Sequence, residues 1–196
     1  MAKYIFDRCA SLLALAVLLP FLLLLAVWVA LDSPGGAFFI QKRVGLHGRT
    51  FGMWKFRTMR PLSEKSGKLT VGERDPRITR AGFFLRKYKL DELPQLFNVL
   101  IGDMSIVGPR PEVPEYVALY NPEQLPVLGV RPGITDYASI RYFNESELLA
   151  RSDDPQRTYI EEVMPAKLAL NLDYIRTRSF LGDLKVIAKT LRRMMG

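Results

Sequence analysis

The sequence predicts an α+β protein that is mainly helical, and three observations lead to this fold class. An uncharged apolar run near the N-terminus is long enough for a helix of membrane length. Two short segments rich in β-branched and aromatic residues follow it and predict a short β-hairpin. The rest of the chain alternates helical apolar spacing with proline- and glycine-bearing connections. We expect three parts: a membrane helix (1–36), a small domain (37–178) and a closing amphipathic helix (179–196).

The apolar run, residues 12–31, contains no charge and a single proline, Pro20. A helix of this length rises about 30 Å, roughly the hydrocarbon thickness of a bilayer. Pro20 removes a backbone hydrogen bond, so we expect the helix to break at Leu19–Pro20. Basic residues flank both ends, which would hold both ends on the cytoplasmic side: Lys3, Arg8, Lys42, Arg43 and Arg49. A broken, re-entrant helix satisfies these observations; a spanning helix with a mild kink is the alternative.

Net charge and composition narrow the function classes. The formal net charge is +8, which implies anionic partners: phospholipid head groups, nucleic acid or a phosphorylated substrate. The membrane segment favours the first and the third. The single cysteine, Cys9, excludes an intrachain disulfide. Because His47 is the only histidine, a zinc site and a Ser-His-Asp triad are both disfavoured.

The middle of the chain predicts a hairpin and then a helix. The segments "AFFIQKRVG" and "TFGMWKFRTM" read as strands joined by the link 45–52, and the polar stretch 61–76 reads as a mobile loop. "RITRAGFFLRKYKL" has helical spacing, with Ile78, Phe84 (or Leu85) and Tyr88 on its apolar side.

A second amphipathic helix follows Asp91, since four apolar residues recur at i, i+3, i+4 and i+7: Leu93, Leu96, Phe97 and Leu100. Asp91 is a plausible N-cap for this helix, with Pro94 at its third position. Proline-rich connections occupy 107–134, and a later helix is expected over about 157–177. The final segment, 179–196, predicts a basic amphipathic helix that either lies among lipid head groups or packs on the domain.

The acidic pair Asp91–Glu92 has two interpretations. The simpler one is a helix cap. The other is a catalytic pair, in which one carboxylate is a nucleophile or Mg²⁺ ligand and its neighbour a base or second ligand. Cations that could hold phosphate favour the second interpretation: Lys55, Arg57, Arg86, Arg110 and Arg131. Arg110 in "GPRPE" and Arg131 in "VRPGIT" each adjoin proline and glycine, which suggests a rigid phosphate clamp rather than two ordinary loops. The sequence contains no Walker A or G-x-G-x-x-G motif.

Three motifs in this order, after an apolar segment, resemble those of the bacterial monotopic phosphoglycosyl transferases: "KFRTM" (55–59), "LDELPQLFNVLIGDMSIVGPRP" (90–111) and "RPGIT" (131–135). The resemblance covers residues 1 to about 135 and returns at "SFLGDLKVIAKTL" (179–191). The resemblance implies transfer of sugar-1-phosphate from a UDP-sugar to polyprenol phosphate (undecaprenyl phosphate), with release of UMP. The product begins a surface polysaccharide or another glycoconjugate.

The same resemblance implies roles for individual residues. Asp91 matches the nucleophile that forms a covalent phosphosugar intermediate, and Glu92 completes the dyad that Mg²⁺ contacts. Lys55 and Arg110 match residues taken to hold phosphate. It also implies a re-entrant helix in the bacterial plasma membrane, with the catalytic domain on the cytoplasmic face beside anionic phospholipid.

The sequence departs from the family pattern in two places. Leu19-Pro20 stands where the best-known members have Ser-Pro, and Asp136, Tyr137 and Ser139 replace Gly, Trp and Gln, a change that could alter sugar specificity. Two rival functions are a membrane scaffold that gathers anionic lipid and a nucleic-acid binder, and no nucleic-acid motif supports the latter. The identity of the sugar, the polyprenol and the oligomeric state remain open.

Overall fold

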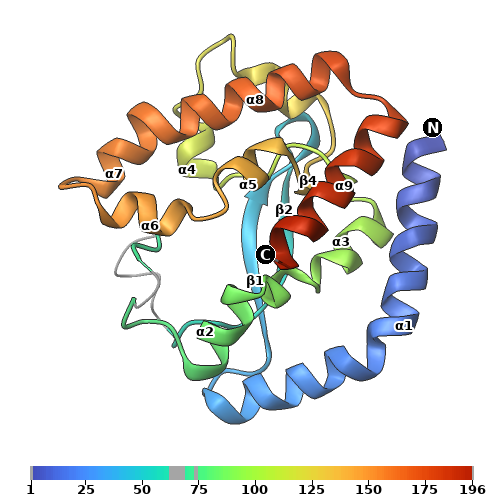
Figure 1. Cartoon of the computed structure of the whole chain (residues 1–196), viewed down its shortest axis with the longest axis vertical. Helices are drawn as coiled ribbons and strands as arrows, with labels where there is room; N and C mark the ends of the chain where they lie inside the picture. The colour runs from blue at the N-terminus through green and yellow to red at the C-terminus, as the bar shows by residue number, and fades with distance from the viewer. Residues whose placement is uncertain (1, 62–68, 73–74, 196) are drawn as a thin grey trace.

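The computed structural model describes residues 2–61, 69–72 and 75–195, and in these ranges the protein is mainly helical (Figure 1). A hairpin of two antiparallel strands lies in the middle, and helices surround it. The predicted α+β class and the predicted hairpin are therefore confirmed. Most of the polar stretch 61–76, predicted to be a mobile loop, lies outside the described residues.

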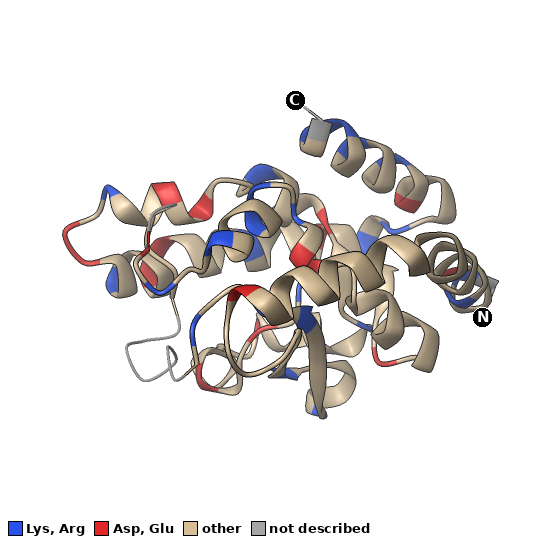
Figure 2. Ribbon diagram, turned by 90° about the horizontal axis from the view of Figure 1, so that it is seen from below, with Lys and Arg blue, Asp and Glu red and all other residues tan. Residues whose placement is uncertain are grey.

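The apolar run forms one long helix, α1 (Ala2–Asp32), with Pro20 inside it. Figure 1 shows that α1 bends near its middle and curves around one side of the molecule. Its inner face packs against the domain through Leu15, Leu22, Leu25 and Val29. Its charged residues lie only toward its two ends, and the helix is drawn almost wholly in tan in Figure 2. It is the one described helix long and apolar enough to cross a membrane.

The hairpin pairs β1 (Phe38–Val44) with β2 (Thr50–Phe56), and η1 (Leu46–Gly48) makes the turn. The link is shorter than the predicted 45–52, since Thr50 already pairs with Val44, and the second strand ends at Phe56 rather than at Met59. Alternate strand residues face opposite sides. Lys55 therefore shares a face with Met53, which is buried against Val99 of the following helix.

Two short helices flank the acidic pair Asp91–Glu92. In α2 (Arg80–Lys87) the buried residues are Ala81, Gly82 and Leu85, whereas Phe84 and Tyr88 are exposed, so the predicted apolar side is correct only in its Leu85 alternative. The next helix, α3 (Gln95–Ile101), begins three residues later than predicted, and Asp91 is not its N-cap. Pro94 lacks an N–H and stands at the cap position instead, so the chain first makes a separate turn.

α3 is fixed from two sides. Leu93, Leu96 and Leu100 pack against α1 as their spacing predicts, while Phe97 is exposed. On the other side the Asn98 amide binds the hairpin: its Oδ1 accepts the Trp54 N–H at 3.0 Å and its Nδ2 donates to the Gly52 carbonyl at 2.8 Å. The acidic motif is thus held at a fixed position relative to β2.

The proline-rich region 107–134 contains elements that the sequence did not predict. The short strands β3 (Ser105–Val107) and β4 (Gly133–Thr135) pair in parallel, and α4 (Pro114–Val117) and η4 (Leu125–Gly129) lie between them. The two segments approach so closely that a Cβ added to Gly133 would lie 2.1 Å from the Gly108 nitrogen. This contact holds the two Arg-Pro segments side by side.

The C-terminal third is helical. It comprises α5 (Tyr137–Arg141), α6 (Glu145–Ala150), α7 (Pro155–Thr158), the π-helical turn η5 (Tyr159–Val163), α8 (Met164–Thr177) and α9 (Phe180–Met195). The helix predicted over 157–177 is confirmed as the run α7–η5–α8. The closing helix is confirmed as α9, which docks through the fully buried Val186 and leaves Leu184 and Leu191 exposed.

Candidate active site

Asp91 and Glu92 lie in η3 (Leu90–Glu92), a single turn between α2 and α3. The turn starts at Lys89, whose backbone adopts the left-handed conformation (φ 55°) that few non-glycine residues take. Such conformations persist only where the surroundings hold them, and they cluster at functional sites. Asp91 is 7% exposed, and within the described ranges it has neither an ion-pair nor a hydrogen-bond partner for its side chain.

Glu92, by contrast, is held by two cations from distant segments. Arg110 donates from Nη1 to Oε2 at 2.9 Å and from Nη2 to Oε1, a bidentate pair. The Lys55 ammonium on β2 lies 3.6 Å from Oε1. The hairpin, the acidic turn and the "GPRPE" segment therefore meet at one carboxylate.

The two carboxyl groups have opposite electrostatic environments. Burial raises the pKa of Asp91, and the negative charge of Glu92 raises it further. Burial would raise the pKa of Glu92 too, but the charges of Arg110 and Lys55 outweigh it and hold that pKa well below its usual value. Burial lowers the pKa of Lys55 to about 8. The pair is thus divided into a firmly ionised Glu92 and a more basic, unpartnered Asp91, the arrangement expected when two acids have different tasks.

The backbone of Arg110 is held by Asp136, which is fully buried. Its Oδ2 accepts the Arg110 N–H at 2.9 Å, and its Oδ1 accepts the Ser139 N–H at 2.5 Å and so caps α5. Asp136 is one of the departures from the family pattern, and its contacts link the start of α5 to the arginine at the site.

The other predicted cations divide into two groups. Arg86, at the end of α2, lies near enough to Asp91 for its charge to lower the pKa of that carboxyl. Arg57 instead donates to the backbone carbonyls of Gly35, Gly36 and Phe38. The Arg131 guanidinium lies over the ring of Tyr4 in α1, at 4.3 Å from its centre. The structure thus brings Lys55, Arg86 and Arg110 to the dyad and gives Arg57 and Arg131 other partners.

Two features near the site were not predicted. Lys89 directly precedes the motif that begins at Leu90. Its left-handed backbone conformation starts the turn η3 and so places it close to the dyad. Glu112 accepts a hydrogen bond from Arg43 of β1 at 2.9 Å and another from the Tyr159 hydroxyl of η5. These bonds fix the segment just after Arg110. No sequence signal links residues so far apart, although a basic strand residue and an acid beside the Pro-Arg-Pro motif were both visible.

The oxygen donors of the Asp91–Glu92 dyad are of the kind that Mg²⁺ prefers. Among the described residues no three His, Cys, Asp or Glu side chains gather as a metal cluster. Mg²⁺ usually takes one or two carboxylates and completes its shell with phosphate oxygens and water. Asp91 has free oxygens of the right kind, and Glu92 adjoins it. The residues therefore fit an ion that arrives with a diphosphate.

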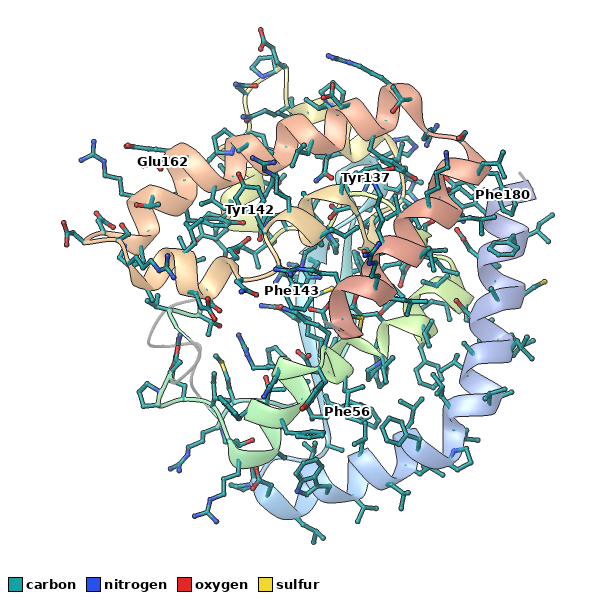
Figure 3. All side chains as sticks on the ribbon, viewed as in Figure 1. Phe56, Tyr137, Tyr142, Phe143, Glu162 and Phe180 are labelled. Atoms are coloured by element: carbon teal, nitrogen blue, oxygen red, sulfur yellow. The ribbon has the colours of Figure 1, made fainter. Side chains whose placement is uncertain are left out.

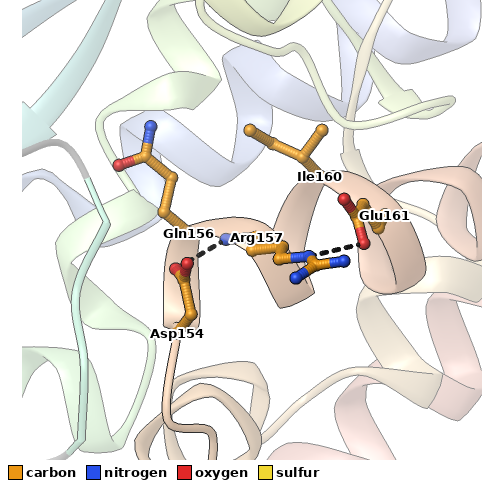
Figure 4. Close-up of a pocket in the computed structure, with 5 residues that line it drawn as sticks. All are labelled: Asp154, Gln156, Arg157, Ile160 and Glu161. Atoms are coloured by element: carbon orange, nitrogen blue, oxygen red, sulfur yellow. Dashed lines mark hydrogen bonds and ion pairs between the residues drawn. The ribbon is translucent and has the colours of Figure 1, made fainter.

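A surface hollow at α7 is a poorer candidate (Figure 4). Its charged side chains already have partners: Asp154 accepts the backbone N–H of Arg157 at 3.0 Å, and the Arg157 side chain pairs with Glu161 at 2.9 Å. Figure 4 shows these contacts within the hollow. It shares no residue with the dyad site.

Comparison with known proteins identifies the family of the chain. The family model described as "Bacterial sugar transferase" matches residues 1–196. The chain belongs to the bacterial sugar transferase family. A relative from Xanthomonas campestris pv. campestris, named UDP-glucose:undecaprenyl-phosphate glucose-1-phosphate transferase, is 40% identical over all of this chain. The match covers 39% of that relative's own length.

Other bacterial sugar transferases extend the comparison. The exopolysaccharide production protein PSS of Rhizobium leguminosarum bv. phaseoli is 40% identical, over 96% of this chain and 92% of its own. The UDP-N-acetylgalactosamine-undecaprenyl-phosphate N-acetylgalactosaminephosphotransferase of Aeromonas hydrophila is 36% identical over 96% of this chain. The match covers 42% of that relative's own length. The chain thus spans about two fifths of the length of the longer relatives.

Proposed function

We propose that the chain transfers the sugar phosphate of a UDP-sugar to polyprenol phosphate, specifically undecaprenyl phosphate, at the cytoplasmic face of the bacterial plasma membrane. UMP is released, and the product is a polyprenyl-diphosphate-linked sugar that starts a polysaccharide or related glycan. The names of the relatives support both substrates. The observation that carries the chemistry is the division of the dyad: a buried, unpartnered Asp91 beside a Glu92 that holds two cations.

In the first step a carboxylate oxygen of Asp91 attacks the β-phosphorus of the UDP-sugar. The bond between that phosphorus and the bridging oxygen breaks, and UMP leaves with the bridging oxygen and its electrons. The sugar phosphate is then joined to Asp91 as an acyl phosphate. The raised pKa of Asp91 suits this role, because a more basic carboxylate is a better nucleophile.

In the second step a phosphate oxygen of the polyprenol phosphate attacks the same phosphorus. The bond to Asp91 breaks and regenerates its carboxylate, and the sugar phosphate passes to the lipid. Lys55 and Arg110, held by Glu92, offset the negative charge on the phosphoryl oxygens in both steps. Mg²⁺, held by Asp91 and Glu92 together with the diphosphate, would supply further charge neutralisation.

Intact mass of the detergent-solubilised protein tests the proposal. With Mg²⁺ and a panel of UDP-sugars, but no lipid, we expect a mass gain of one phosphosugar for the correct donor. The gain should disappear on addition of polyprenol phosphate, on chelation of Mg²⁺ and in Asp91→Asn. Glu92→Gln retains the nucleophile and should form the adduct slowly. Turnover with lipid in Asp91→Asn at the wild-type rate would rule out the covalent role of Asp91.

A further inference from the structure

Two cations from distant segments meet at one aromatic ring near the dyad. The Lys89 ammonium lies 4.9 Å from the centre of the Phe143 ring, and the Arg193 guanidinium lies 5.1 Å from the same centre. Lys89 starts the acidic turn, Phe143 lies between α5 and α6, and Arg193 lies in the last turn of α9. Figure 3 shows Phe143 near the middle of the molecule, where the end of α9 reaches it.

The two cations differ from Lys55, Arg110 and Arg43 because neither has a carboxylate partner, and they differ from Arg86 because they share one aromatic ring. Lys55 and Arg110 pair with Glu92, and Arg43 pairs with Glu112. Within the described part of the chain, no such ion pair involves Lys89 or Arg193. Their common contact is the ring, which attracts each cation by about 1 kcal/mol but does not neutralise it. Two like charges held at one ring form a site that an anion would stabilise.

The proposed reaction needs such an anion site in addition to the groups that hold the transferred phosphoryl. In-line displacement at phosphorus places the attacking and leaving groups on opposite sides. UMP therefore leaves from the side opposite Asp91, and the polyprenol phosphate must attack Asp91-bound phosphorus from that same side. The leaving and the entering groups are both phosphate monoesters, so one subsite can hold each in turn.

We propose that Lys89 and Arg193, held against Phe143, form this subsite, which binds the phosphate of UMP and, after its departure, the phosphate of the polyprenol acceptor. This inference rests on the proposed function. Lys89 also lies close enough to both Asp91 and Glu92 for each to act on its pKa, which agrees with a position next to the reacting phosphorus. The subsite is complete only when α9 is docked, because Arg193 belongs to that helix.

The docking of α9 is itself fixed by buried polar contacts. Asp183 of α9 accepts hydrogen bonds from Lys3 of α1 at 2.5 Å and from the Tyr174 hydroxyl of α8 at 2.7 Å. Val186, one turn further on, is fully buried. Arg193 is therefore delivered to Phe143 by a helix with a defined position rather than by a free tail.

The test compares Arg193→Gln with Arg192→Gln, which removes the same charge from the neighbouring exposed position of the same helix. Two quantities are measured in a neutral detergent: the affinity for UMP by calorimetry, and the KM for polyprenol phosphate in UMP-releasing turnover. We expect Arg193→Gln to weaken the affinity for UMP about tenfold and to raise the KM for polyprenol phosphate about tenfold. This is the effect of losing one charge-assisted hydrogen bond. Arg192→Gln should change each less than twofold. Phe143→Leu should resemble Arg193→Gln, and Phe143→Tyr should stay near wild type because it keeps the ring.

Equal effects of Arg193→Gln and Arg192→Gln on both quantities would overturn the subsite while leaving the proposed function intact. If Arg193→Gln changes only the UMP affinity, or only the KM for the acceptor, then the phosphates of UMP and of the polyprenol do not share the subsite. If the wild-type protein releases no UMP from any UDP-sugar, the proposed function and the acceptor half of this inference both fail. The calorimetry with UMP then still decides whether the ring-bound cations bind phosphate.

Discussion

The charges of Asp91 and Glu92 have opposite consequences for stability. Asp91 is buried beside a like charge without a partner, so its ionised form costs free energy of folding. We expect Asp91→Asn to unfold at the same temperature as the wild type or higher. Glu92→Gln leaves Arg110 and Lys55 without their counter-charge, and we expect a loss of about 2 kcal/mol. Thermal and denaturant unfolding of the two isosteric variants checks both signs; equal destabilisation would contradict the assigned environments.

Lys55 predicts a pH dependence of phosphate binding. Its pKa is lowered to about 8, mainly by burial, so in the free protein the ammonium loses its charge as the pH rises through about 8. Affinity for the UDP-sugar, whose transferred phosphoryl group Lys55 is proposed to hold, should therefore be full below this pH and decline above it when measured without added Mg²⁺. Lys55→Arg keeps the charge throughout this range and should remove the decline. Calorimetry from pH 6.5 to 9.5 provides the measurement, and an unchanged decline in Lys55→Arg would assign it to another group.

At the scale of the elements, Asp136 links the start of α5 to the Arg110 backbone. Asp136→Ala removes the acceptor of two backbone N–H groups at a fully buried position, and we expect it to cost about 2 kcal/mol. It should also lower kcat/KM, because Arg110 is no longer held. Asp154→Ala is the matched control: Asp154 caps α7 in the same way at an exposed position and should cost about 1 kcal/mol or less, without loss of activity. Equal losses in both variants would contradict the link to Arg110.

The elements that sequence patterns predicted are those whose signal is local. The hairpin, the α7–η5–α8 run and α9 follow from the alternation or helical spacing of their own residues. The pair β3–β4 was missed because three-residue strands have no periodicity, and their pairing depends on contact between Gly108 and Gly133. The cap assignment of Asp91 was wrong because the left-handed turn at Lys89 leaves no mark in the residue type.

The candidate site shows the same limit. Asp91, Glu92, Lys55 and Arg110 were named from composition, spacing and family resemblance, but the pairing of Arg110 with Glu92 depends on tertiary contact. Arg57 has the residue type expected for phosphate binding, yet it donates to two carbonyls of the turn before β1 and to that of Phe38, the first residue of β1. Only the fold decides which cations of a basic chain keep donors for a substrate.

At the scale of the whole molecule, both ends of α1 are attached to the same small domain. Near its start, Lys3 binds Asp183 of α9 at 2.5 Å and Asp7 accepts from Ser105 of β3 at 2.6 Å. At its end, Asp32 accepts the Ala81 N–H of α2 at 2.9 Å. A helix that crossed the bilayer would separate its two ends by about 30 Å of hydrocarbon, and one set of contacts would break. The bend near the middle of α1, a helix that contains Pro20, supports the alternative, in which the helix enters and leaves on one side.

Single-cysteine labelling distinguishes these topologies. In a Cys9→Ser background, Ile5→Cys and Lys42→Cys each introduce a thiol at an exposed position, one before and one after the apolar run. We expect both to react with a membrane-impermeant maleimide in inside-out vesicles and neither to react in intact spheroplasts, because the buried ion pair and hydrogen bonds hold both ends with the domain. Reaction of one position from each side would show a spanning helix. In that case the contacts of Lys3 and Asp7 with α9 and β3 could not coexist with membrane insertion, and the subsite that α9 completes would have to form in another way.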